Sequence, residues 1–156
     1  MEDNLVTEQL LDFYRHHDGA TLFLDVTSDR AGLHLLPIGS WKRLQSVVIE
    51  LYGEFREEFG LEWLDHFVAF GEVPHSGNYF VMPTHGTSAG NVIYCDHEGP
   101  TFLDWAPDFH TFLRLFLDSP CEQIYQLGSF LRFDEHGSDR QWIPERFFAG
   151  ENFRRE

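Results

Sequence analysis

The stretch from His66 to Cys95 decides the fold and reads HFVAFGEVPHSGNYFVMPTHGTSAGNVIYC. Three runs within it are rich in the aromatic and β-branched residues that favour strands, and they span 66–71, 78–82 and 91–95. The residues between these runs are mostly proline, glycine, serine and threonine, which are typical of turns. Because short turns join antiparallel strands, the stretch predicts the centre of an antiparallel sheet.

Helices and shorter strands are predicted on both sides of this centre. Apolar residues recur at helical spacing before the stop signal Asp18-Gly19, after the capping residue Ser40 and after Pro107. Short β-prone runs at 20–26 and 32–38 predict a hairpin, and 101–105 predicts a further strand. Helices therefore flank a run of strands without regular alternation, which favours an α+β domain with a mainly antiparallel sheet.

The length and composition predict a single domain over residues 1–156, because 156 residues with 42% hydrophobic side chains can bury a core of their own. Residues 121–156 are treated as a possible C-terminal extension. Cys95 and Cys121 are too few for a disulfide framework, so reduced thiols are expected. The start of the chain lacks the pattern of a secretory signal, and no run of about 18 apolar residues occurs, which indicates a cytoplasmic protein.

The charge of the chain favours a basic protein partner. There are 26 acidic residues against 11 Lys and Arg, for a formal net charge of −15. Such a field repels phosphate backbones and anionic lipids, which disfavours direct binding to nucleic acid or to membranes. The candidate contact surface is an acidic helix face together with a turn, and its residues are Glu50, Glu54, Glu57, Glu58, Asp134 and Glu135. The alternative is that these carboxylates only keep the protein in solution.

No catalytic residue, metal ligand or cofactor site is predicted. Gly86-Thr87-Ser88-Ala89-Gly90 matches the G-x-S-x-G motif of serine hydrolases, but that motif needs a helix directly after the serine, and here a strand is expected. A small hydrolase using Ser88 therefore stays an unfavoured alternative. The nine histidines include no H-E-x-x-H motif, and the glycines form no phosphate-binding loop.

Five short motifs follow one another along most of the chain. They are Leu11-Asp12-Phe13-Tyr14 with Asp18-Gly19, Leu36-Pro37-Ile38, Val68-Ala69-Phe70-Gly71 with Gly77-Asn78-Tyr79-Phe80, Gly90-Asn91-Val92-Ile93-Tyr94 with Asp96-His97-Glu98-Gly99, and Phe109-His110-Thr111-Phe112-Leu113. Their order resembles the SUKH superfamily, which includes bacterial immunity proteins and fungal regulators of cell-wall synthesis. The motif residues are expected to be structural.

The resemblance implies a SUKH-like α+β binding domain and not a reaction. Combined with the negative charge, it favours a non-enzymatic immunity protein that neutralises a bacterial toxin by occluding the active groove of a basic toxin domain. The alternative of the same fold is an intracellular scaffold or regulator, similar to the fungal members. The segment after Pro120 falls outside the shared pattern and is expected to form an extra hairpin that sets partner choice.

Overall fold

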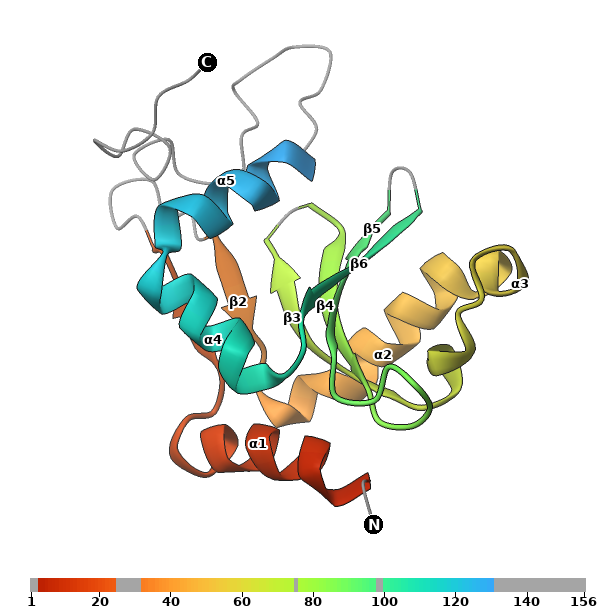
Figure 1. The fold of residues 1–156 in the computed structure, drawn as a ribbon, viewed down its shortest axis with the longest axis horizontal. Helices are drawn as coiled ribbons and strands as arrows, with labels where there is room; N and C mark the ends of the chain where they lie inside the picture. Colours follow the sequence, from red (N-terminus) through yellow and green to blue (C-terminus); the bar gives the residue numbers. More distant parts are fainter. Residues whose placement is uncertain (1–2, 25–31, 75, 98–99, 131–156) are drawn as a thin grey trace.

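An antiparallel sheet forms the centre of the protein in a computed structural model, which describes residues 3–24, 32–74, 76–97 and 100–130 (Figure 1). Within these ranges the sheet has six strands in the order β1-β2-β3-β4-β5-β6. The strands are β1 (Ala20–Leu22), β2 (Leu33–Leu35), β3 (Phe67–Val73), β4 (Asn78–Pro83), β5 (Val92–Asp96) and β6 (Thr101–Ala106). Each strand pairs antiparallel with the next strand in sequence, which confirms the predicted α+β class.

Helical segments flank this sheet. They are α1 (Asp3–His16), α2 (Ile38–Tyr52), η1 (Gly53–Phe55), α3 (Arg56–Phe59), η2 (Glu62–Asp65), α4 (Phe109–Asp118) and α5 (Pro120–Phe130), where η denotes a 3-10 helix. The expected start of α2 was wrong by three residues, and α4 begins at Phe109, two residues after Pro107. Pro37 and not Ser40 takes the cap position of α2, and the α4 cap is Asp108, whose carboxylate accepts a hydrogen bond from the Thr111 N–H at 2.7 Å.

Two hydrophobic cores lie on the two faces of the sheet, because side chains alternate along each strand. Along β5, Val92 and Tyr94 enter one core, whereas Ile93 and Cys95 enter the other. The aromatic core also contains Phe70 of β3 and Phe80 of β4, together with helical residues from α1, α4 and α5, among them Leu10, Phe109, Phe112, Phe116, Ile124 and Leu127. The α2 core contains Leu44, Val48, Tyr52, Leu61, Leu64, Phe67, Ala69 and Val81. In Figure 1, α4 and α5 lie on one side of the strands and α2 and α3 on the other.

A bulge in β3 changes which face of the sheet the later residues of the strand occupy. The register with β4 shifts between Ala69 and Gly71, so Phe70 is an additional residue opposite β4. Before the bulge, Phe67 and Ala69 face the α2 core, whereas Val73, at the same alternation after the bulge, lies with Phe70 in the aromatic core.

Residues 120–130 form α5 and not part of a hairpin, which corrects the expectation for this segment. Ile124 and Leu127 are fully buried in the aromatic core, and the Trp105 indole N–H donates to the Gln123 side-chain oxygen at 3.0 Å. Helix α5 thus packs directly on the sheet domain. The rest of the expected hairpin lies outside the described residues. None of the helices described here has both the length and the apolar character needed to cross a bilayer.

Candidate functional site: an acidic segment and an adjoining pocket

Asn78 organises one end of the sheet through its buried side-chain amide, which is 2% exposed. Its oxygen accepts a hydrogen bond from the His97 backbone N–H at 3.2 Å and lies 2.9 Å from Nδ1 of the His97 ring. Its nitrogen donates to the Tyr94 hydroxyl at 2.7 Å. Burial raises the pKa of Tyr94 well above its ordinary value, and the Asn78 hydrogen bond acts in the opposite direction. One amide therefore ties β4 to β5 and to the residue that follows it.

Two motif glycines allow close approaches that a side chain would prevent. Gly77 has φ +75°, and a Cβ there would lie 3.1 Å from the His97 ring. Gly19 has φ +87°, and a Cβ there would lie 2.4 Å from the Leu35 carbonyl oxygen. Both positions favour glycine because their backbone conformation is left-handed and their space is occupied.

The remaining motif residues are divided between the cores and the surface. Phe80, Phe109 and Phe112 lie in the aromatic core, whereas Tyr79 packs against the α2 core. Asp96 is 2% exposed, and Asp18 is exposed after α1. The structure therefore spreads the motif residues through the fold and does not gather them into one site.

Four of the predicted contact residues are exposed, but they do not share the face of one helix, because they are divided among α2, η1 and α3. Glu50 lies in the last turn of α2, Glu54 lies in η1, and Glu57 and Glu58 lie in α3. Within the part of the chain that the structure describes, none of them forms an ion pair. Residues 50–58 are called the acidic segment below. The predicted Asp134 and Glu135 lie outside the described residues.

The positive charge within the acidic segment is held by a neighbouring carboxylate. The Arg56 guanidinium donates two hydrogen bonds to Asp65, one of them at 2.8 Å between Nη1 and Oδ1. These bonds lower the pKa of Asp65 and raise that of Arg56. Asp65 therefore holds the Arg56 guanidinium, and the four glutamates form no ion pair with it.

Exposed apolar side chains border the acidic segment. Ile49 is 48% exposed and Phe59 is 44% exposed. The Phe59 ring also packs edge-to-face against Phe102, with 5.7 Å between the ring centroids. An apolar side chain held beside charged ones is typical of the anchor positions in protein interfaces.

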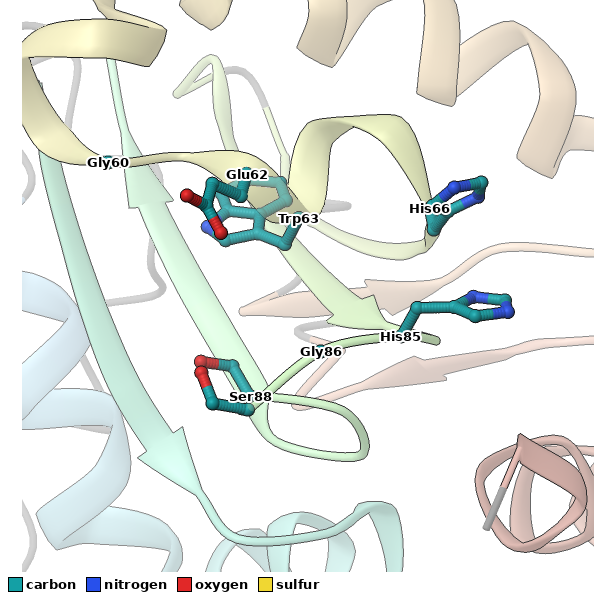
Figure 2. A pocket seen from close by; sticks show the side chains of 8 residues that line it. Gly60, Glu62, Trp63, His66, His85, Gly86 and Ser88 are labelled. Carbon is teal, nitrogen blue, oxygen red and sulfur yellow. The ribbon is translucent and has the colours of Figure 1, made fainter. Parts of the chain in front are cut away.

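A pocket of about 220 Å³ opens directly after the acidic segment, between η2 and the loop that joins β4 to β5. Its lining residues are Gly60, Glu62, Trp63, His66, His85, Gly86, Thr87 and Ser88. Figure 2 shows Glu62 and Trp63 on one side and Ser88 on the loop across from them. The His66 and His85 rings lie next to each other, with 4.6 Å between their centroids.

The pairing of β3 with β4 brings the two walls of this pocket together. Phe67 and Pro83 are opposite each other at one end of the pair, and the Thr84 N–H donates to the His66 carbonyl oxygen at 2.8 Å. The loop is a compact turn, in which the Gly90 N–H donates to the Pro83 carbonyl oxygen at 2.9 Å. The sequence alone did not indicate the pocket, because its two walls come from segments that lie about twenty residues apart in the chain.

The Ser88 segment lacks the geometry of a nucleophile elbow. A helix should follow the serine in that motif, whereas here the chain continues from Ser88 into strand β5. The Ser88 hydroxyl forms no hydrogen bond to any residue that the structure describes, so no base is paired with it. Among those same residues, no group of three or more His, Cys, Asp or Glu side chains is arranged to hold a metal ion.

Comparison with known proteins identifies the family. The model of the SMI1 / KNR4 family (SUKH-1) matches residues 6–115, which is well over half of the chain. Comparisons with curated proteins and with solved structures found no match. The matched range runs from α1 into α4 and includes the five sequence motifs, the acidic segment and the pocket. The chain therefore belongs to the SMI1 / KNR4 family (SUKH-1) of the SUKH superfamily.

Proposed function

We propose that this chain is a non-enzymatic immunity protein that acts in the cytoplasm and neutralises a toxin domain by covering its active groove. Membership of the SUKH superfamily supports a binding role, because the superfamily includes immunity proteins and regulators. The observation that carries the proposal is the acidic segment, where Glu50, Glu54, Glu57 and Glu58 are exposed and unpaired among the described residues.

The electrostatics of the chain suit a basic partner whose own ligand is an anion. A net charge of −15 attracts such a partner over distance and raises the rate of encounter. Carboxylates can then occupy the positions where a toxin binds phosphate groups of nucleic acid. Affinity requires buried anchors in addition to charge, and Ile49 and Phe59 are exposed apolar candidates for that role.

Co-expression with the toxin domain encoded beside this gene tests the proposal. Wild-type protein should restore growth of cells that express the toxin, and Glu54→Lys/Glu57→Lys should restore it less well. The matched control is Glu8→Lys/Glu122→Lys, which makes the same change in net charge at exposed positions on α1 and α5. Failure of the wild-type protein to restore growth, while both proteins are made, would contradict the immunity role.

A regulatory scaffold is the second candidate, because membership of this family is consistent with a regulatory protein as well as with an immunity protein. Isolation of the protein from native cells separates the two roles. One stoichiometric partner that remains bound at high salt supports immunity. Several unrelated partners that dissociate at high salt support the scaffold, because weak surface interactions are strongly screened.

A further inference from the structure

We infer that the pocket between η2 and the β4–β5 loop receives an arginine side chain of the partner protein. The inference rests on the proposed function, in which the partner is basic, and adds the group that this surface recognises. It is carried by the placement of a carboxylate and an indole on one wall of the pocket, opposite hydroxyl groups on the other.

The aromatic wall is held in place from behind. The Trp63 ring packs edge-to-face against Phe67 and Phe102, with centroid distances of 5.4 and 6.1 Å. Trp63 is only half-buried, and it lines the pocket. A guanidinium group is planar and weakly hydrated, so it stacks well on an indole that is already positioned.

The carboxylate of the pocket is available to a ligand. Glu62 is exposed, lines the pocket beside Trp63, and forms no ion pair with any described residue. A guanidinium stacked on Trp63 can donate to this carboxylate and direct its other N–H groups to the hydroxyl oxygens of Thr87 and Ser88. Arginine fits better than lysine because it offers five donors in one plane.

The size and location of the pocket favour a single protein side chain. Its volume of about 220 Å³ is below the roughly 300–1,000 Å³ that is usual for pockets that bind drug-sized ligands. Its lining begins at Gly60, which directly follows α3 and the acidic segment. A basic surface attracted by Glu57 and Glu58 therefore meets the pocket in the same encounter.

Titration with Nα-acetyl-L-arginine methylamide, followed by NMR on ¹⁵N-labelled protein, tests the inference. The indole N–H signal of Trp63 should shift and saturate. Glu62→Gln should weaken binding about threefold or more, since a charge-assisted hydrogen bond is lost. The matched control is Glu122→Gln, which removes the same charge from an exposed residue on α5, outside both the pocket and the acidic segment, and it should weaken binding much less. Trp63→Phe keeps an aromatic ring and should weaken binding about twofold or more.

Four outcomes would overturn the inference. They are no shift of the Trp63 signal, equal losses in Glu62→Gln and Glu122→Gln, equal binding of the uncharged citrulline analogue, and a strong preference for free arginine over the blocked probe. The last outcome would indicate a metabolite site. Growth rescue by the wild-type chain without any probe binding would remove the pocket inference and leave the proposed function standing. Saturable binding of the arginine probe without rescue would support the pocket and contradict the immunity role.

Discussion

The two faces of the sheet differ in what their side chains do. On one face, Phe70 and Phe80 meet residues of α1, α4 and α5 in a closed aromatic core. On the other face, α2 covers the sheet, and the chain then continues into the exposed acidic segment and the pocket. The proposed recognition surface is therefore separate from the aromatic core, and we expect that this surface can change without loss of the fold. The following predictions test that separation.

The largest effect is expected in the aromatic core. Phe112 is fully buried, and its ring centroid lies 5.0 Å from those of Phe80 and Phe116. Phe112→Ala should lower the free energy of unfolding by about 3–5 kcal/mol, measured by urea denaturation, because it leaves a cavity. Leu117→Ala in the same helix is the control, since Leu117 is 68% exposed. Similar losses in both variants would contradict the assignment of Phe112 to the core.

The Asn78 network should have the next largest effect. Asn78→Ala leaves the buried Tyr94 hydroxyl and the His97 N–H without this partner, which should cost about 2–3 kcal/mol of unfolding free energy. Asn91→Ala is the matched control, because among the described residues the Asn91 side chain makes one long hydrogen bond, of 3.4 Å to Asp104 at the surface. If thermal denaturation shows equal losses, the Asn78 amide does not organise this end of the sheet.

Two glycine variants separate the energetic cost of a positive φ from the cost of a contact with the His97 ring. Gly77 and Gly86 both have positive φ, +75° and +85°, but only at Gly77 would a Cβ meet a neighbour. Gly86→Ala should cost about 1 kcal/mol for its backbone conformation, and Gly77→Ala about 1 kcal/mol more. Chemical denaturation measures both, and a Gly77→Ala loss no greater than that of Gly86→Ala would mean that the His97 ring moves freely.

The acidic segment should contribute almost nothing to stability. Replacing Glu50, Glu54, Glu57 and Glu58 by Gln should change the free energy of unfolding by less than about 0.5 kcal/mol, because exposed residues without partners rarely affect it. Relief of charge repulsion acts toward greater stability. A large loss in urea denaturation would show that these carboxylates hold the fold together and would break the contrast between the two faces.

The strands and the two-sided core were predictable from local pattern. From Val92 to Cys95, successive side chains enter the two cores alternately, as expected for a strand. Glycine-rich turns separate the strand-forming runs. The exposure of the four glutamates agreed with the amphipathic pattern, although the expected single helix is divided into α2, η1 and α3. Asp18-Gly19 and Gly60 ended helices as expected, since left-handed glycines stop them.

Features that depend on distant residues were not predictable. The bulge at Phe70 reverses the side-chain alternation within β3, which only the pairing with β4 reveals. Helix α5 contains Gly128 and begins at Pro120, which obscured its helical pattern. The pocket joins Trp63 to Ser88 through that same strand pairing, and nothing in either segment alone indicates the other.

Stopped-flow association with the toxin domain encoded beside this gene, measured over a range of salt concentrations, tests the central claim most directly. The account predicts that Glu54→Lys/Glu57→Lys slows association at low salt by about tenfold, an effect that fades as salt screens the charges. The equally charged Glu8→Lys/Glu122→Lys should slow it far less. Equal slowing by both pairs, or no slowing by either, would show that the acidic segment is not the contact surface.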